Sequence, residues 1–251
     1  MAETILVTGA SAGFGQAICR RLVADGHRVI GAARRIEKLQ ALHEELGEAF
    51  YPLQMDVTDL TQVDHALASL PADWEQIDVL VNNAGLALGL APTQKAEIAD
   101  WLTMIQTNII GLTYLTRQIL PRMVERNDGY VINMGSTAGT VPYPGANVYG
   151  ASKAFVKQFS LNLRADLAGK QIRVTNIEPG LCEGTEFSSV RFKGDEKRVE
   201  ALYRDAHAIQ PEDIANTVSW LIQQPKHVNV NRIEIMPVSQ TFGPQPVYRG
   251  D

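Results

Sequence analysis

The 251-residue chain contains only two cysteines, Cys19 and Cys182. Neither stands in a spacing typical of a redox motif or a metal site, so the cysteines provide no reactive pair and no zinc cluster. A chain this poor in cysteine is suited to a reducing compartment. We therefore expect a cytoplasmic protein in which both thiols contribute to packing rather than to chemistry.

Long apolar runs and an excess of positive charge are also missing. No apolar stretch is long enough to span a bilayer, and the opening residues MAETILVTGA lack the basic-then-apolar order of a secretory signal. With 23 Lys and Arg against 28 Asp and Glu, the formal charge of −5 argues against nucleic acid or an anionic membrane. We expect neither of these as the main partner.

Two further kinds of site find no support. No His, Cys or Asp residues show the spacing of metal ligands, so no metal residue is predicted. No Gly-Lys-Ser/Thr sequence is present, which disfavours an ATP-type phosphate loop. The histidines fall mostly on predicted helix ends or surfaces, which disfavours a Ser-His-Asp hydrolase; they are His27, His43, His65, His207 and His227.

What the sequence does contain is a regular alternation of β-branched apolar runs and helical patterns. The runs predict strands at 4–8, 28–32, 49–54, 79–82, 130–134, 173–178 and 232–236. Helices are predicted at 15–25, 36–46, 58–70, within 99–126, at 148–168 and at 211–223, and the glycines that follow helical runs, as C-terminal caps do, are Gly26, Gly47, Gly129 and Gly169. Continuously apolar strands that alternate with helices indicate a parallel sheet covered on both faces.

We therefore predict one doubly wound α/β domain over residues 1–251. The least regular stretch, 181–205, is rich in Gly, Ser and charge, and a loop of this length in a compact domain is usually functional, such as a lid. The tail 238–251 shows no regular pattern and is open to interpretation as a subunit contact or a frayed end.

A glycine-rich turn, Gly9-Ala10-Ser11-Ala12-Gly13-Phe14-Gly15, joins the first predicted strand to the first helix. This context suits a turn that cradles a phosphate at a helix N-terminus. Gly9 allows the tight turn, Gly13 the close approach of a pyrophosphate, and Gly15 close packing of helix on strand. The spacing differs from the standard Gly-x-Gly-x-x-Gly, and a plain strand–helix connector is the alternative. In its context the turn predicts dinucleotide binding.

The end of the second predicted strand indicates which dinucleotide is bound. An NAD site places Asp or Glu there, on the ribose 2′-hydroxyl, whereas this chain has Arg34 and Arg35 with no acid before Glu37. A guanidinium can clamp a 2′-phosphate through paired hydrogen bonds, and Ser11 can donate another. The alternative is that the arginines start a solvated helix. The residues favour NADP(H) as the cofactor.

Tyr149 and Lys153 are four residues apart on a predicted helix and therefore share a face. A tyrosine with a pKa of about 10 is a poor base near neutrality, but a nearby ammonium favours its phenolate. Such a pair can exchange a proton with an alcohol or its carbonyl compound. Ser136 follows a strand end and can polarise the same oxygen. The alternative for each residue alone is that Tyr149 only starts a helix and that Ser136 only belongs to a turn.

The chain resembles the classical short-chain dehydrogenases/reductases over nearly its whole length. The matching motifs are Thr8-Gly9-Ala10-Ser11-Ala12-Gly13-Phe14-Gly15, Asp56-Val57, Asn82-Asn83-Ala84-Gly85, Asn108, Ser136, Tyr149-x-x-x-Lys153 and Pro179-Gly180. The resemblance implies a Rossmann-type sheet with a nicotinamide cofactor across its carboxyl edge, and usually a homotetramer. It also implies roles for individual residues: Asp56 and Val57 beside the adenine, Asn82 to Gly85 beside the adenosine, and Asn108 holding a water that relays protons from Lys153. Lys153 is further implied to bond the cofactor ribose.

The loop that follows Pro179-Gly180 would contact both cofactor and substrate. Its first part, with Leu181 and Thr185, would run beside the nicotinamide and pyrophosphate. Its second part places Arg191 and Lys193 where a lid could meet the far end of the substrate, and an arginine suits a carboxylate or sulfonate. Charges on a mobile solvated loop are the alternative, favoured for Lys193.

A narrower resemblance rests on a combination of motifs: Gly13-Phe14-Gly15, Asn147-Val148-Tyr149-Gly150-Ala151-Ser152-Lys153, Glu178-Pro179-Gly180, Gly184-Thr185-Glu186-Phe187-Ser188 and Arg191-Phe192-Lys193-Gly194-Asp195. This combination resembles that of the bacterial NADP-dependent 3-hydroxy acid (serine) dehydrogenases and is also similar to that of the sulfoacetaldehyde reductases. The first group implies oxidation of serine or 3-hydroxypropionate, or reduction of malonic semialdehyde, and the second implies formation of isethionate. The motifs do not separate a carboxylate from a sulfonate, although Cys182-Glu183 is a place where the difference could reside. Two other hypotheses remain open: a catalytically silent NADP-binding regulator, and an oxidoreductase for bulky apolar substrates. The full set Asn108, Ser136, Tyr149 and Lys153 argues against the regulator.

Overall fold

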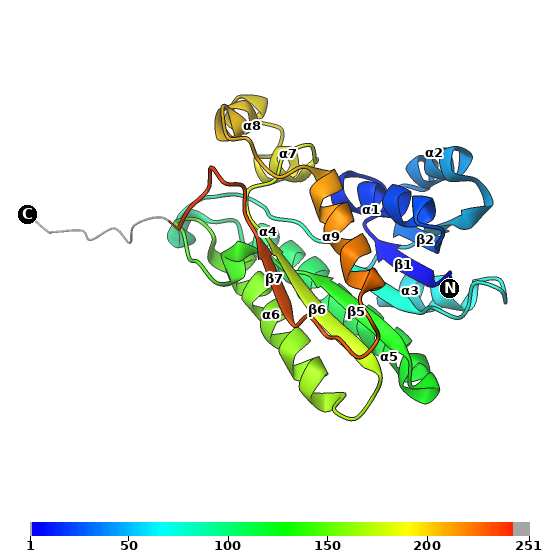
Figure 1. Ribbon diagram of the computed structural model, residues 1–251. Coiled ribbons are helices and arrows are strands. Elements are labelled where there is room, and N and C mark those ends of the chain that lie inside the picture. The colour runs from blue at the N-terminus through cyan, green and yellow to red at the C-terminus, as the bar shows by residue number, and fades with distance from the viewer. Residues whose placement is uncertain (1, 243–251) are drawn as a thin grey trace, which may run out of the picture.

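The computed structural model describes residues 2–242, and its centre is a sheet of seven parallel strands (Figure 1). The strands lie in the order β3-β2-β1-β4-β5-β6-β7. Their bounds are β1 Thr4–Thr8, β2 Arg28–Ala33, β3 Phe50–Gln54, β4 Val79–Asn82, β5 Gly129–Met134, β6 Ile172–Pro179 and β7 Arg232–Ile235. Each strand bound differs from the predicted one by a single residue at most. The predicted doubly wound α/β sheet is confirmed.

Helices cover both faces of the sheet (Figure 1). One layer consists of α1 (Gly13–Ala24), α2 (Ile36–Leu46) and α9 (Pro211–Gln223), and the other of α3 (Leu60–Ala68), α5 (Leu112–Arg126) and α6 (Asn147–Asp166). Successive residues of β1 point to opposite faces, so Val7 packs with Leu22 of α1 while Leu6 packs with Leu115 of α5. This two-sided burial explains why the strands are apolar without alternation.

The order of the strands creates a crevice at one edge of the sheet. From β1 the chain proceeds outward through β2 and β3, then crosses over to β4 and proceeds in the other direction. Helices that follow β1 and β4 therefore lie on opposite faces, which leaves a gap above the carboxyl ends of these two strands. The residues directly after these strands, Gly9 and Asn83, both line the resulting cleft.

Two irregular parts of the structure differ from the prediction. The long helical pattern within 99–126 forms α4 (Ile98–Ile105) and α5, separated by a π-helical turn over Gln106–Gly111. The segment 181–205, predicted as irregular, contains two short helices, α7 (Phe187–Arg191) and α8 (Glu196–Tyr203). Three short 3₁₀ turns lie at Gly47–Ala49, Thr93–Lys95 and Thr137–Gly139.

The predicted cap at Gly129 is wrong. Helix α5 ends at Arg126, and its C-terminal cap is Asn127, which adopts the left-handed conformation (φ 53°). Gly129 instead begins β5, where a Cβ would lie 2.6 Å from Cγ of Met123. Asn tolerates the left-handed region better than most residues, so it can end a helix in place of glycine.

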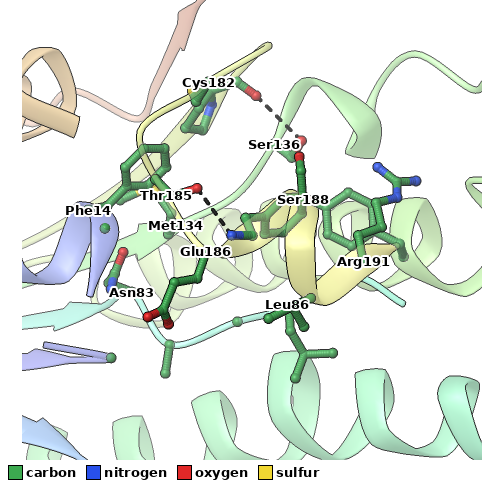
Figure 2. A pocket seen from close by; sticks show the side chains of 18 of the residues that line it. Phe14, Asn83, Leu86, Met134, Ser136, Cys182, Thr185, Glu186, Ser188 and Arg191 are labelled. Carbon is green, nitrogen blue, oxygen red and sulfur yellow. Dashed lines mark hydrogen bonds between the residues drawn. The ribbon is translucent and has the colours of Figure 1, made fainter. Parts of the chain in front are cut away.

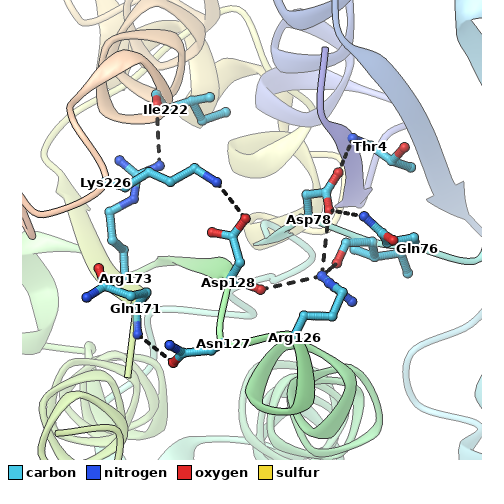
Figure 3. A network of polar contacts seen from close by, with 11 residues as sticks. Thr4, Gln76, Asp78, Arg126, Asn127, Asp128, Gln171, Arg173, Ile222 and Lys226 are labelled. Carbon is cyan, nitrogen blue, oxygen red and sulfur yellow. Dashed lines mark hydrogen bonds and ion pairs between the residues drawn. The ribbon is translucent and has the colours of Figure 1, made fainter. Parts of the chain in front are cut away.

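A polar network joins the amino ends of the strands, at the sheet edge opposite the cleft (Figure 3). The Asp78 carboxylate accepts a hydrogen bond from the backbone N–H of Thr4 at 3.0 Å and lies 3.6 Å from the Arg126 guanidinium. The buried Arg173 donates to the carbonyl of Leu221, in the last turn of α9, at 3.0 Å. Because these groups satisfy backbone atoms of the scaffold, we assign this edge a structural role.

Within residues 2–242, no helix combines the length and the apolar character that crossing a bilayer requires. The same residues contain no group of three His, Cys, Asp or Glu side chains arranged to hold a metal ion. Burial raises the pKa of the Cys19 thiol and raises that of Cys182 to about 12. Both thiols are therefore protonated at neutral pH and are poor nucleophiles.

Candidate active site

The glycine-rich turn brings the backbone of β1, the start of α1 and the chain after β4 into close contact. Gly9 has a φ of 69°, and a Cβ there would lie 2.9 Å from the side-chain nitrogen of Asn83. At Gly15 a Cβ would clash with the Gly9 carbonyl. Ala12 precedes α1 and supplies no side-chain cap, so the first N–H groups of this helix are left to bind an anion.

One cleft of about 610 Å³ extends along the carboxyl ends of the strands. Most of the predicted site residues line it, and these are Gly9, Ser11, Ala12, Gly13, Phe14, Arg34, Arg35, Asp56, Val57, Asn83, Ala84, Gly85, Ser136, Tyr149, Lys153, Pro179, Gly180, Leu181, Thr185 and Arg191. Figure 2 shows part of this wall, with Ser136 and Arg191 beside the loop that bears Thr185 and Glu186. Residues predicted from six separate motifs thus meet in a single cavity.

Four predicted residues lie behind the cleft surface rather than on it: Thr8, Gly15, Asn82 and Asn108. The Asn82 amide donates to Oγ1 of Thr116 and Oδ1 of Asn133, each at 2.9 Å, and so links β4 to α5 and β5. The Thr8 hydroxyl accepts the backbone N–H groups of Asn83 and Ala84. These residues shape the cleft from behind, and the predicted cofactor contacts of Thr8, Gly15 and Asn82 stay predictions.

Tyr149, Lys153 and Ser136 converge at the centre of the cleft. Tyr149 lies in the first turn of α6 and Lys153 one turn later, with its Nζ 5.9 Å from the Tyr149 ring centroid. The Lys153 ammonium donates to the carbonyl of Met134 at 2.8 Å. Ser136 follows β5, and its hydroxyl accepts the Ala138 N–H at 3.1 Å. Lys153 therefore lies near Tyr149 as predicted, and all three side chains line the same cleft.

Burial dominates the proton affinities of this group. It raises the pKa of Tyr149 to about 12, although the Ser136 side chain and the Arg191 charge lower it. Burial also lowers the pKa of Lys153 to about 8. From the sequence we predicted that the Lys153 ammonium lowers the pKa of Tyr149. In the structure the lowering influences come from Ser136 and Arg191, because the lysine ammonium is turned to the Met134 carbonyl.

Asn108 lies in the π-helical turn and holds the chain after β4. Its Oδ1 accepts the Leu86 N–H at 3.0 Å, and its Nδ2 donates to the Leu86 carbonyl at 2.9 Å and to Oγ of Ser152 at 3.0 Å. A Cβ on Gly85 would lie 3.3 Å from both Asn108 Oδ1 and Lys153 Nζ, so the two side chains flank this glycine. The predicted water relay stays a prediction.

Arg35 and Lys38, which follow β2, form an ion cluster with Glu186 of the loop 181–205. Arg35 donates to Ser11 Oγ from Nε at 3.3 Å and from Nη2 at 3.1 Å, and its Nη2 also lies 2.8 Å from the Glu186 carboxylate. Lys38 binds the same carboxylate at 2.9 Å. Arg34 is exposed on the rim of the cleft. A guanidinium and a hydroxyl thus meet where the sequence predicted a 2′-phosphate site.

Arg191 lies at the end of α7 and covers the inner part of the cleft. Its Cζ lies 5.4 Å from the ring centroid of Tyr149 and 5.4 Å from that of Tyr143. Its Nη2 donates to the Tyr143 hydroxyl at 2.8 Å and its Nε to the Gly89 carbonyl at 3.4 Å. Lys193 instead pairs with Asp100 of α4 at 2.8 Å and does not line the cleft. Of the two cationic residues predicted on this loop, Arg191 therefore lines the cleft and Lys193 does not.

Sequence reasoning missed several residues that line the cleft. Tyr143 orients Arg191, Phe187 packs on Tyr149 with ring centroids 5.7 Å apart, and Glu186 pairs with Arg35. Gln240 accepts the Leu181 N–H at 2.7 Å, so the start of the predicted tail contacts the cleft. Residues 243–251 of that tail lie outside the described part. Tyr143 lies between Pro142 and Pro144, just before α6, and this position could have marked it in the sequence as a residue of the site.

The surroundings of Ser11 bear on the alternative that the protein is a serine hydrolase. Ser11 stands in a Gly-Ala-Ser-Ala-Gly sequence, which matches the nucleophile-elbow pattern of serine hydrolases. Its hydroxyl accepts from Arg35, and no histidine is among the residues that line the cleft in the described chain. A serine nucleophile needs a base within hydrogen-bond reach, so this serine is better suited to anion binding.

Comparisons with known proteins agree with this geometry. The family model described as short chain dehydrogenase matches residues 3–196. A probable NADP-dependent dehydrogenase of Haemophilus influenzae is 59% identical over 239 residues, covering 95% of each chain. An NADP-dependent 3-hydroxy acid dehydrogenase of Salmonella typhimurium is 59% identical over 245 residues, covering 98% of this chain and 99% of that protein.

Among solved structures, the closed form of a serine dehydrogenase complexed with NADP+ superposes with a TM-score of 0.97. It is 56% identical and covers 98% of this chain and all of its own. The match of the family model over most of the chain, together with these relatives, shows that this protein belongs to the short-chain dehydrogenase family.

Proposed function

We propose that this protein is an NADP(H)-dependent oxidoreductase that interconverts a small anionic hydroxy compound and its aldehyde. The observation that carries the proposal is the position of Arg191, whose guanidinium lies 5.4 Å from the ring of the buried Tyr149 in the same cleft. A cation beside a proton donor suits a substrate whose reacting oxygen and anionic group are a short carbon bridge apart. The names of the relatives, which include 3-hydroxy acid and serine dehydrogenases, point to the same chemistry.

The residues fit NADP(H) at both ends of the cleft. The turn from Gly9 to Gly15 and the uncapped start of α1 suit a pyrophosphate, and Ser11 with Arg35 suits a 2′-phosphate. At the inner end, Lys153 lies beside Gly85 and Tyr149, where a nicotinamide ribose would be held. When bound, the cofactor supplies or accepts the hydride.

The chain's own residues provide the proton and hold the substrate. In the reducing direction, the Tyr149 hydroxyl donates its proton to the carbonyl oxygen as that oxygen gains negative charge. In the oxidising direction the phenolate takes the proton back. Ser136 donates a hydrogen bond to the same oxygen, and Lys153 holds a positive charge one helical turn away. With a pKa of about 12, Tyr149 is protonated at neutral pH and is ready to donate.

For the substrate we propose a 3-hydroxy acid or its semialdehyde, of the 3-hydroxypropionate, malonic semialdehyde or serine kind. A guanidinium has five N–H donors, and in the described chain Arg191 uses the one on Nε and one of the two on Nη2, so those on Nη1 and the second on Nη2 remain. Because Arg191 lines the cleft, these remaining donors on Nη1 and Nη2 could bind a carboxylate through paired hydrogen bonds. Sulfoacetaldehyde is the second candidate, because a sulfonate offers oxygens to the same donors.

The test is an NADPH-oxidation assay with malonic semialdehyde, sulfoacetaldehyde and propanal, a neutral aldehyde of similar length. We expect kcat/KM to be at least about tenfold higher for one of the two anions than for propanal, since a hydrogen bond to a charged group contributes about 1.5–3 kcal/mol. The higher of the two anion values identifies the carboxylate or the sulfonate as the natural group. Equal values for all three aldehydes would contradict an anionic substrate, and no turnover of any would favour the silent regulator.

The pH profile of aldehyde reduction provides a second expected result. Burial brings the pKa of Lys153 from 10.5 to about 8, so its ammonium is present below that pH and is lost above it. We expect kcat to be constant below about pH 8 and then to fall as one proton is lost, because Tyr149 keeps its own proton up to about pH 12. Circular dichroism at each pH controls for unfolding. A plateau that continues to pH 10 would show that the charge on Lys153 is not required.

A cytoplasmic homotetramer is also proposed. Large apolar side chains are exposed on α4 and α6, where Ile98 is 65% and Leu102 59% exposed, and Phe155 38%. Apolar side chains exposed on neighbouring helices are typical of subunit contacts, which supports an oligomer.

A further inference from the structure

Lys193 follows helix α7 in a backbone conformation that lysine rarely adopts. Its φ is 53°, in the left-handed region that glycine usually occupies directly after a helix. The Lys193 N–H donates to the Val190 carbonyl at 3.2 Å, as in a helix end of this kind. The next N–H, of Gly194, donates to the Ser189 carbonyl at 2.9 Å and completes the pattern. The chain therefore has a lysine at a position where glycine would form the same turn without strain.

The side chain of this lysine reaches Asp100, in the first turn of α4. Its Nζ lies 2.8 Å from Oδ2 of Asp100, and the Asp100 side chain is 17% exposed. A carboxylate that is largely removed from water needs a charged or polar partner, and the lysine supplies one. Strained backbone conformations persist where the surrounding structure holds them, and they are concentrated at functional sites. The unusual conformation of Lys193 thus coincides with a specific contact of its side chain.

The ion pair lies beside the contact that fixes the backbone of Arg191, the last residue of α7 (Figure 2). The Gly89 N–H donates to the Arg191 carbonyl at 2.9 Å, and Nε of Arg191 donates to the Gly89 carbonyl at 3.4 Å. A Cβ on Gly89 would lie 3.6 Å from Oδ2 of Asp100, so the carboxylate is next to this pair of bonds. An ionic contact and a backbone contact therefore join the end of α7 to the chain between β4 and the first turn of α4.

We propose that Lys193 and Asp100 are positioning residues for substrate binding, and that their ion pair holds the end of α7 so that the Arg191 guanidinium faces the anionic group of the substrate. The inference rests on the proposed role of Arg191. Lys193 is two residues from this arginine and does not line the cleft, so it acts on the substrate through the arginine. Without the pair, part of the binding energy of the guanidinium is spent on ordering it.

The first test is Lys193→Gly, which removes the ion pair and relieves the backbone strain in one change. If the lysine served only the turn, glycine would serve it equally well or better. We expect KM for the anionic aldehyde, the better of malonic semialdehyde and sulfoacetaldehyde, to rise about fivefold, the upper end for an exposed ion pair. We expect kcat, and kcat/KM for propanal, to stay within about twofold.

Thermal unfolding of Lys193→Gly, followed by circular dichroism, is expected to give the wild-type Tm. The relief of strain in the folded chain offsets the greater freedom of glycine in the unfolded chain. A rise in KM at an unchanged Tm therefore separates positioning of the guanidinium from a loss of stability.

Three further variants test the ion pair itself. Asp100→Asn removes its other half, leaves the lysine and its turn in place, and is expected to raise the same KM about fivefold. Lys193→Arg keeps the charge and is expected to hold KM within about twofold of the wild type. Lys197→Gln is the control, because it removes a positive charge from α8 in the same loop, away from Asp100, and is expected to leave KM unchanged.

Combining Lys193→Gly with Arg191→Ala tests the route of the effect. If the lysine acts through the arginine, the two changes are not additive, and the double variant has the same KM as Arg191→Ala alone. A further rise of about fivefold in the double variant would show that the pair acts without the guanidinium, and would overturn the inference.

The outcomes separate this inference from the proposed function. If Arg191→Ala raises KM for the anionic aldehyde but Lys193→Gly and Asp100→Asn leave it unchanged, the positioning role is wrong and the proposed function stands. Equal losses for propanal and the anionic aldehyde in these two variants would also overturn it, because the pair would then act on the loop as a whole. If Arg191→Ala leaves KM unchanged, the proposed role of Arg191 fails, and the inference fails with it.

Discussion

Replacing Tyr149 by phenylalanine is expected to lower kcat for aldehyde reduction about a thousandfold, in the middle of the range for loss of a general acid. Binding of NADPH, followed by the change in its fluorescence, is expected to stay within about twofold. The variant removes one oxygen atom. It keeps the ring that packs on Phe187 with centroids 5.7 Å apart, so the wall of the cleft retains its shape.

The expected size of the effect follows from the surroundings of the hydroxyl. Tyr149 is 8% exposed, and burial raises its pKa to about 12, so the proton is held in the ground state. The Ser136 side chain lowers this pKa, and both residues line the cleft, where the two hydroxyls can meet a substrate oxygen. Without the tyrosine, the nearby proton source is Lys153, whose ammonium donates to the Met134 carbonyl instead.

Tyr114→Phe is the matched control, since it removes a hydroxyl from α5 that binds Asp64 at 2.7 Å outside the cleft. Its kcat is expected to equal that of the wild type. A Tyr149→Phe enzyme that keeps more than a tenth of wild-type kcat would show that another group delivers the proton. Weaker NADPH binding in proportion to lost activity would instead assign the tyrosine to cofactor binding.

The fold was predictable because each strand buries both faces. In the sequence such strands are short apolar runs bounded by helical patterns. The strands Thr4–Thr8 and Val79–Asn82 match the prediction residue for residue. The segment 181–205 was not predictable in this way, because α7 and α8 are short and polar. Helix α8 contains no buried residue, and α7 buries Ser188, so apolar periodicity is too weak to mark either.

The site was predictable where its residues are close in sequence and unpredictable where they meet through the fold. Tyr149 and Lys153 share one helix face, and the glycine turn is continuous, so spacing alone placed them. The contacts of Arg35 with Glu186 and of Lys193 with Asp100 join segments far apart in the chain. The π-helical turn that holds Asn108 was missed for another reason: such turns are rare, single-turn interruptions of a helix, and the pattern within 99–126 was interpreted as one helix.

Replacing Arg191 by alanine is expected to raise KM for the anionic aldehyde about a hundredfold, because two hydrogen bonds to a charged group are lost. For propanal, kcat/KM is expected to change by less than about threefold. A small effect on propanal is expected because the Arg191 charge lowers the pKa of Tyr149, and without that charge the phenol is a slightly weaker acid. Both KM values are read from the same NADPH-oxidation assay.

Arg191→Lys separates the charge from the paired geometry. The lysine retains the positive charge near Tyr149 but cannot donate two parallel hydrogen bonds, so we expect a rise in KM of about tenfold, between wild type and alanine. Arg198→Ala is the control, because this arginine belongs to the same loop but stacks on Phe192 at 4.7 Å and does not line the cleft. If Arg191→Ala slows propanal and the anionic aldehyde equally, the guanidinium acts through Tyr149 and not on the substrate's anionic group, and the choice between carboxylate and sulfonate must then be made elsewhere in the cleft.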